Sequence, residues 1–239
     1  MRPSAAVFHV SGVFVDMPKT HFFALRRIAE QLAVPFSEED EVRTRGAGSL
    51  GSVEIILEMG GLSLSMPDKQ ELVRKMIAFQ EDYVRRIGPA DLMTGSLELL
   101  QRLKSLGAGT AVILGRESSA YAIERVGLAD AFDCRLSPDD GIQASTHPED
   151  FRIAASRLGT SPDRCVAFLS NPRSIVVARA TGLAVVGIGD AKHVGAADLV
   201  LPGLWAFRTA HWDELGERLA ARTADVSSMR AYTYEGASL

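Results

Sequence analysis

The sequence predicts an α/β protein with a parallel sheet as its core and a block of helices inserted after the first strand. Two observations favour this class. From residue 95 onward, short apolar runs alternate with helical segments, which is the pattern of crossover units in a parallel sheet. Residues 17–90, in contrast, carry helical patterns only, and they follow an apolar run that begins at residue 5. We therefore expect one core that carries a helical insertion.

The apolar runs have the length and composition of buried strands. Such strands are continuously apolar because helices cover both faces of a parallel sheet. The first run ends in a short polar loop that contains His9 and Ser11. Ligands of open parallel sheets bind at the carboxyl ends of the strands, so this loop is the first candidate for a site. The other strands are expected at residues 110–114, 132–136, 165–169, 183–188 and 198–201.

The insertion is predicted to be helical throughout. Residues 19–33 place apolar side chains at helical spacing, and residues 53–58 form a second helix that the following glycine pair ends. A long helix begins after Ser65, with a proline in its first turn, and ends near Gly88. The glycine-bearing segment 43–49 is interpreted as a turn.

These patterns divide the chain into a core (1–16 and 91–223), a helical insertion (17–90) and a C-terminal tail (224–239). The tail is small, polar and aperiodic, so we expect it to be frayed or used in an oligomer contact. Helices of the core are expected at residues 96–105, 117–126, 149–158, 174–181 and 212–222.

Composition excludes several classes of partner. The chain has 239 residues, of which 46% are hydrophobic, so it can bury a sizeable core. A net charge of −4 supplies no basic field, so we expect neither nucleic acid nor a membrane surface as a partner. The sequence shows no secretory signal pattern, and a cytoplasmic location is expected. Cys134 and Cys165 lack metal-type spacing and are interpreted as buried, reduced thiols.

The first loop resembles a known motif. The frame Phe8-x-x-x-Gly12-Val13-x-x-Asp16, with an amphipathic helix after it, resembles the first motif of the haloacid dehalogenase (HAD) superfamily, in particular its β-phosphoglucomutase and phosphoglycolate-phosphatase branch. The resemblance extends over residues 5–220 and implies a Rossmann-like core with a small helical cap that excludes water during phosphoryl transfer. It also rests on Tyr83-Val84, Gly95, Glu124-Arg125-x-Gly127-Leu128, Phe132-Asp133, Asp150 and Ala178-x-Ala180-x-Gly182-Leu183.

The positions that carry chemistry in that family are occupied differently here. The family loop reads Phe-Asp-x-Asp-Gly, with one aspartate as phosphoryl acceptor and the other as acid/base, whereas this chain has His9 and Ser11. Leu114 takes the place of a phosphate-binding serine or threonine, and Thr146 takes the place of a lysine. Where the family has acidic Mg²⁺ ligands, this chain has Leu169-Ser170-Asn171.

These replacements predict a member of the superfamily that does not catalyse phosphoryl transfer. That reaction depends on a metal and a cation that offset the charge of the transferring group. Mg²⁺ prefers oxygen ligands that include carboxylates, and none is present in these positions. We therefore expect no catalytic residue, no metal and no cofactor. We expect a pseudoenzyme that binds a small anionic or neutral metabolite, or a protein partner.

Two alternatives remain at this stage. His9 could serve as an acid/base without a metal in an enzyme of another class. The chain could also be a residual phosphatase or phosphoglucomutase-like hydrolase. A histidine that only fills the space of a lost metal is the interpretation that we favour for His9.

The candidates for ligand contact are His9, Ser11, His21, Arg116, His147, Asn171 and Arg173. A metal-independent anion pocket could combine Ser11, Asn171 and the two arginines, because both arginines lie where helices expose free backbone N–H groups. Solvated arginines at helix starts are the alternative. His9 and His147 together would supply only two metal ligands, which is weak evidence for a metal site. We interpret Asp16 as a helix N-terminal carboxylate and Asp139-Asp140 as an ordinary turn.

Overall fold

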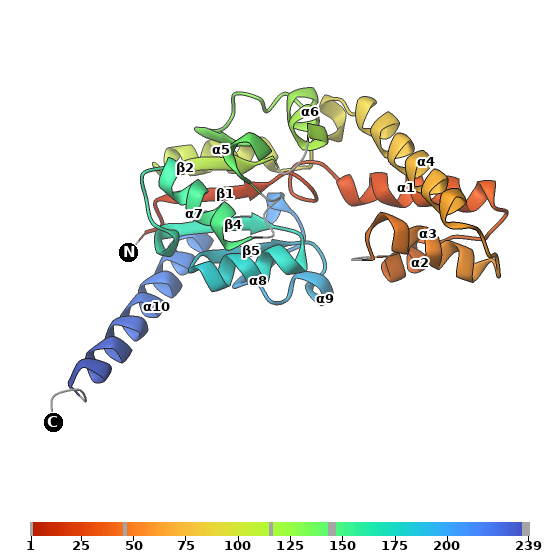
Figure 1. Cartoon of the computed structure of the whole chain (residues 1–239). Helices are drawn as coiled ribbons and strands as arrows, with labels where there is room; N and C mark the ends of the chain where they lie inside the picture. The colour runs from red at the N-terminus through yellow and green to blue at the C-terminus, as the bar shows by residue number, and fades with distance from the viewer. Residues whose placement is uncertain (1, 45–46, 115–116, 143–146, 236–239) are drawn as a thin grey trace. The chain divides into compact units, whose positions relative to one another are not determined.

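The computed structural model describes residues 2–44, 47–114, 117–142 and 147–235. The chain divides into two compact units (Figure 1). Met1–Val15 and Pro89–Leu239 form the core unit, and Asp16–Gly88 forms the helical unit. Within the described ranges, no helix combines the length and the apolar character that crossing a membrane requires.

The core unit contains a six-stranded parallel sheet, which confirms the predicted fold class. Its strand order is β3-β2-β1-β4-β5-β6. The order reverses between β1 and β4, and such a switch point opens a crevice at the carboxyl ends of the strands. The strands are β1 (Ala5–His9), β2 (Gly109–Ile113), β3 (Cys134–Leu136), β4 (Cys165–Leu169), β5 (Ala184–Ile188) and β6 (Leu199–Leu201).

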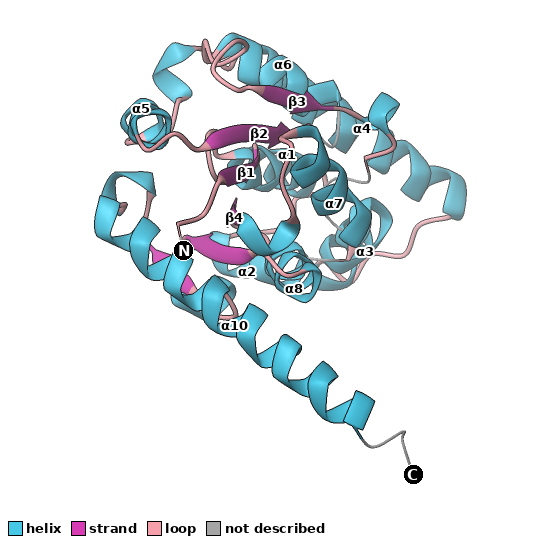
Figure 2. Ribbon diagram, turned by 90° about the vertical axis from the view of Figure 1, so that its left-hand side faces the viewer, coloured by secondary structure: helices cyan, strands magenta, loops and turns pink. Residues whose placement is uncertain are grey.

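Helices cover both faces of the sheet. Figure 2 shows α5 and α10 on one side and α7 and α8 on the other. On the first side, the Phe8 ring stacks on Phe168, with centroids 4.9 Å apart, and Phe168 meets Phe207 at the start of α10. On the other side, Phe151 and Ile175 bury against the sheet. The helices are α5 (Ser96–Ser105), α6 (Glu117–Arg125), α7 (Pro148–Arg157), α8 (Pro172–Thr181), α9 (Ala191–Val194) and α10 (Thr209–Glu235).

The last helix is longer than the sequence suggested. We expected it to end near residue 222, with an aperiodic tail after it, but α10 continues to Glu235. Residues 223–235 contain no glycine or proline, so no residue there breaks the helix. The first glycine after residue 222 in the sequence is Gly236, which follows the last residue of α10.

The helical unit contains α1 (Met17–Gln31), α2 (Glu38–Thr44), α3 (Gly48–Met59) and α4 (Met66–Arg85). Leu25, Ile28 and Met76 lie at the centre of its own hydrophobic core. Side-chain N-caps stabilise the starts of two of these helices. Asp16 accepts from the Lys19 N–H at α1, as expected of a helix N-terminal carboxylate, and Ser65 accepts from the Asp68 N–H at α4.

The sequence interpretation missed α2. The segment 43–49 was expected to be a turn, but Arg43 and Thr44 form the end of this helix. Ser37 and Asp40 cap its start reciprocally, because the Ser37 N–H donates to the Asp40 carboxylate at 2.8 Å and the Asp40 N–H donates to the Ser37 hydroxyl at 3.3 Å. A serine followed three residues later by an acidic residue is a recognisable capping signal.

A buried carboxylate anchors α8 and α10 to the edge of the sheet. Asp198 precedes β6, and its side chain is 3% exposed. It accepts from the Val185 N–H at 2.8 Å and pairs with Arg179 of α8 at 3.3 Å and with Arg222 of α10. Arg222 also donates to the Leu183 carbonyl at 3.1 Å. The hydrogen bond from the Val185 N–H fixes the Asp198 carboxylate. Arg179 and Arg222 therefore tie α8 and α10 to the same carboxylate.

We predict that Asp198→Ala lowers the free energy of unfolding by about 2–4 kcal/mol, because it leaves the buried Val185 N–H without its acceptor and removes the carboxylate that pairs with both arginines. Urea denaturation of the full chain measures this change. The control is Asp213→Ala, which removes a 2.6 Å pair with Arg2 whose side chains are 43% and 62% exposed. Such an exposed pair contributes less than about 1 kcal/mol. Equal losses in the two variants would contradict the anchoring role of Asp198.

Candidate functional site

The candidate site lies at the switch point between β1 and β4. His9 is the last residue of β1 and pairs in register with Ile113 of β2, directly before Leu114. Phe8 pairs with Phe168, so Leu169 and Ser170 extend from the neighbouring strand at the same edge. The structure thus brings the ends of β1, β2 and β4 together, as the parallel register requires.

The loop after β1 is held by its own backbone. The N–H groups of Val13, Phe14 and Val15 all point to the Val10 carbonyl, at 3.0–3.3 Å, and the Gly12 N–H donates to the Val15 carbonyl at 2.8 Å. Gly12 has φ of +70°, a conformation that glycine adopts without steric strain. This tight turn fixes the position of the Ser11 carbonyl.

Ser170 joins the two loops that flank the switch point. Its hydroxyl donates to the Ser11 carbonyl oxygen at 2.7 Å. The Ser11 carbonyl oxygen thus accepts a hydrogen bond from Ser170, at a position where it would otherwise be available to a cation or a ligand. The sequence shows the serine but not its partner, because the two residues are 159 positions apart.

His9 is in an environment that disfavours a charged ring. Removal from water lowers the pKa of the imidazole to about 4, and a hydrogen bond with the backbone of Ser11 offsets only part of this effect. Its Nδ1 atom is buried and, among the described residues, has no hydrogen-bond partner. The ring is therefore neutral at pH 7, and only part of its hydrogen-bonding capacity is used.

The donors at this edge do not fit Mg²⁺. They comprise an imidazole and two hydroxyls, next to the apolar side chains of Leu114 and Leu169, which are buried. Across the described part of the chain, no group of three histidine, cysteine or acidic side chains could hold a metal ion. Residues 115–116 and 143–146, which lie outside that part, contain no aspartate or glutamate in the sequence. A hard cation that prefers carboxylate and carbonyl oxygens finds no suitable set.

The start of α8 is not an open anion site. The Asn171 side chain accepts from the N–H groups of Arg173 and Ser174, at 2.9 and 3.2 Å. Pro172 has no N–H. Most of the backbone N–H groups that we expected to be free at the start of α8 are therefore absent or already bonded. The Arg173 side chain is exposed.

The other candidates are dispersed. His147 is exposed and lies at the N-cap of α7, so its pairing with His9 in a metal site gains no support. His21 belongs to the helical unit, where its Nδ1 lies 2.6 Å from the Gln80 amide nitrogen. Arg116 and Thr146 lie outside the described residues.

The remaining polar candidates have structural roles. Asp140 closes a short turn by accepting from the Ser137 N–H at 2.9 Å, and it pairs with Arg157 at 2.8 Å. Both cysteines are free thiols, and burial raises the pKa of Cys165 to about 12. None of these groups extends the site at the strand ends.

We predict a pH dependence of stability that originates at His9. Its folded-state pKa of about 4 lies below the ordinary histidine value of 6.5, so the unfolded chain binds the proton more readily. The free energy of unfolding should therefore fall as the pH drops from about 6.5 to about 4, by up to roughly 3 kcal/mol. Urea denaturation of the wild type and of His9→Phe, which cannot titrate, should diverge over this interval.

The matched control is His193→Gln, at an exposed position on α9. It should keep the wild-type dependence on pH, because the substitution leaves His9 and the loop after β1 unchanged. Parallel curves for the wild type and His9→Phe would show that the His9 ring is solvated.

Comparison with known proteins agrees with this architecture. The family model of haloacid dehalogenase-like hydrolases matches residues 5–173. A β-phosphoglucomutase of Bacillus subtilis is 28% identical over 199 residues, which cover 82% of this chain and 88% of that protein. A phosphorylated carbohydrates phosphatase of Thermotoga maritima is 24% identical over 211 residues, which cover 83% of this chain and 94% of that protein.

The structural comparison supports the same fold. A crystal structure of β-phosphoglucomutase from Clostridium difficile superposes with a TM-score of 0.73 at 20% identity, covering 92% of this chain and 99% of that one. These findings confirm the resemblance to the β-phosphoglucomutase branch that the sequence predicted. With a family model matched over most of its length, the chain belongs to the haloacid dehalogenase-like hydrolases.

Proposed function

We propose that this chain is a non-catalytic member of its family that binds a small polar metabolite at the strand-end site. The observation that carries the proposal is the donor set at the switch point: His9, Ser11 and Ser170, with Ser170 bonded to the Ser11 carbonyl. The set contains no carboxylate. A neutral, hydroxyl-rich crevice is suited to hydrogen bonding with a ligand and not to holding Mg²⁺.

Phosphoryl transfer requires charges that this set lacks. The reaction proceeds through a transition state whose negative charge is offset by a metal and by positioned cations. A carboxylate acceptor and a second carboxylate that manages the proton are replaced by His9 and Ser11. Leu114, which is buried, adds an apolar surface in place of a hydroxyl.

His9 is poorly suited to replace the missing groups. With a pKa of about 4, its ring carries almost no proton to donate at neutral pH and is only a weak base. A neutral imidazole can still donate or accept a hydrogen bond. We infer that His9 contacts a ligand or supports the loop without exchanging a proton.

The relatives suggest the class of ligand. Their names describe proteins that act on phosphorylated carbohydrates and on glucose phosphates. The hydroxyl and imidazole groups here suit the hydroxyls of a related sugar or polyol. We propose that the helical unit acts as a cap for this site, as the resemblance implies.

Phosphatase assays test the proposal. With Mg²⁺ present, the wild type should release no more phosphate from sugar phosphates, phosphoglycolate or p-nitrophenyl phosphate than His9→Ala does, because neither protein can bind the metal at the strand ends. Metal-dependent turnover that disappears in His9→Ala would identify a working enzyme and overturn the proposal.

The melting temperature of the same protein provides a control that is independent of substrate choice. A ligand at about 100 times its dissociation constant stabilises the native state by roughly 2.7 kcal/mol, which raises the melting temperature of a domain of this size by about 5–10 °C. Millimolar Mg²⁺ and EDTA should both leave the curve unchanged. A saturable rise with Mg²⁺, lost on substitution of Asp16 or of Asp139 and Asp140, would show that other carboxylates form a metal site.

A further inference from the structure

A second candidate site lies wholly within the helical unit, on α1 and α4. Phe23, Arg26, Arg27 and Glu30 are spaced i, i+3, i+4 and i+7, so they form one stripe of α1. The stripe of α4 has the same spacing and consists of Phe79, Asp82, Tyr83 and Arg86, the last being the C-cap residue. Each stripe combines aromatic and charged side chains.

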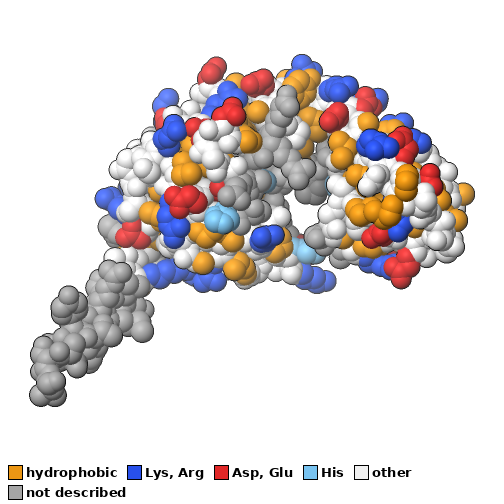
Figure 3. Space-filling view, viewed as in Figure 1, with side chains coloured by type: hydrophobic (Ala, Val, Ile, Leu, Met, Phe, Trp, Pro, Cys, Tyr) orange, Lys and Arg blue, Asp and Glu red, His pale blue; other side chains and the backbone are white. Residues whose placement is uncertain are grey.

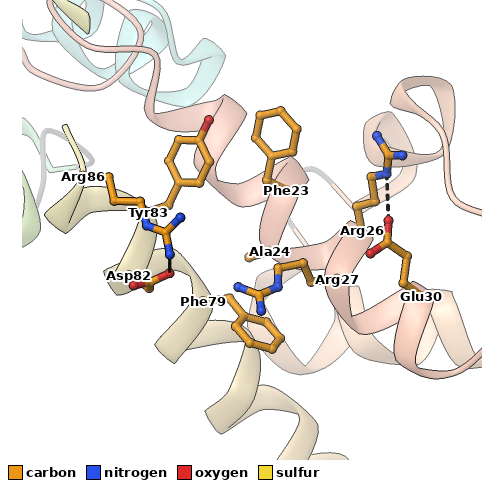
Figure 4. A pocket seen from close by; sticks show the side chains of 9 residues that line it. All are labelled: Phe23, Ala24, Arg26, Arg27, Glu30, Phe79, Asp82, Tyr83 and Arg86. Carbon is orange, nitrogen blue, oxygen red and sulfur yellow. Dashed lines mark hydrogen bonds and ion pairs between the residues drawn. The ribbon is translucent and has the colours of Figure 1, made fainter. Parts of the chain in front are cut away.

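The two stripes enclose a hollow of about 310 Å³ (Figure 4). Ala24 contributes only a methyl group to its lining. Phe23 and Tyr83 stack across the helices, with centroids 5.3 Å apart and ring planes at 14°. The volume is at the lower end of the range for sites that bind small molecules. The face of the helical unit seen in Figure 3 likewise shows hydrophobic side chains among charges of both signs.

The charges around the hollow are not equivalent. Arg26 pairs with Glu30 at 3.1 Å, and Arg86 pairs with Asp82 at 2.7 Å. Arg27 instead lies over the Phe79 ring, with its guanidinium carbon 3.9 Å from the centroid. Among the residues that the structure describes, no acidic side chain forms an ion pair with Arg27.

Stacking leaves the hydrogen-bonding capacity of Arg27 intact. A guanidinium group interacts with a ring through its face, while its N–H groups point outward in its own plane. These donors match the two oxygens of a carboxylate. The hollow therefore offers a fixed cation beside aromatic and methyl surface.

From this geometry we propose that the groove between α1 and α4 binds a small organic carboxylate with an aromatic body. The carboxylate pairs with Arg27, and the ring packs over Ala24 against Phe23 or Tyr83. An inorganic anion would leave the apolar surface exposed, and a neutral aromatic compound would leave Arg27 unpaired. This site is independent of the strand-end site and of the function proposed for it.

The test uses 3-phenylpropionate as the probe, with ¹⁵N-labelled full-length protein and NMR titration. We expect chemical-shift changes on α1 and α4 that saturate with a dissociation constant of about 0.1–5 mM, a range suited to so small a ligand. The neutral analogue 3-phenylpropionamide should bind at least about tenfold more weakly, and inorganic phosphate should cause no saturable change there.

Matched variants separate the specific site from general charge attraction. Arg27→Gln should weaken binding at least about tenfold, whereas Arg74→Gln, at an exposed arginine of α4 that pairs with Glu71 and lies outside the lining of the hollow, should leave it unchanged. Ala24→Leu should fill the hollow and abolish binding while the spectrum stays dispersed. Absence of binding at about 20 mM, equal effects of the two arginine variants, or changes confined to the core unit would each overturn the proposal.

Discussion

The hydrogen bond from the Ser170 hydroxyl to the Ser11 carbonyl is the contact around which the site is built. It joins the loops after β1 and β4 at the point where the strand order reverses. Parallel sheets of this order present their ligand crevice there. The Ser170 hydroxyl donates to the Ser11 carbonyl oxygen at 2.7 Å, and this hydrogen bond links the two loops directly.

The chemistry of the strand-end site follows from its neutral side chains and from the burial of His9. Without carboxylates, the edge carries no negative charge for a cation to balance, and the desolvated His9 ring stays neutral. The proposed function rests on a strand-end site of this fold whose side chains are neutral. Fold and site are separable in this way because the sheet is stabilised by apolar packing, such as the Phe8–Phe168 stack, which does not involve the loop side chains.

Most of the fold could be predicted from the sequence, whereas for the candidate site the sequence indicates which strand ends meet but not the contacts that form there. Continuous apolar runs identify the strands, and Ser65 and the proline after Met66 identify the start of α4, because these signals are local. The continuation of α10 to Glu235 escaped prediction because its residues have no apolar period, although no residue there breaks a helix. The Asn171 cap, the Ser170–Ser11 bond and the unpartnered His9 Nδ1 depend on side-chain directions or on distant partners, which spacing does not specify.

Electron paramagnetic resonance of Mn²⁺ tests the central claim most directly. Mn²⁺ accepts the same oxygen ligands as Mg²⁺, and its free form gives a spectrum whose amplitude falls on binding. The account predicts that wild-type protein leaves the free signal unchanged. The combined variant His9→Asp, Ser11→Asp and Ser170→Asp, which returns carboxylates to the strand ends, should reduce it. Saturable, stoichiometric loss of the free signal with the wild type would contradict the account, because it would show a metal site where the structure places an imidazole and two hydroxyls.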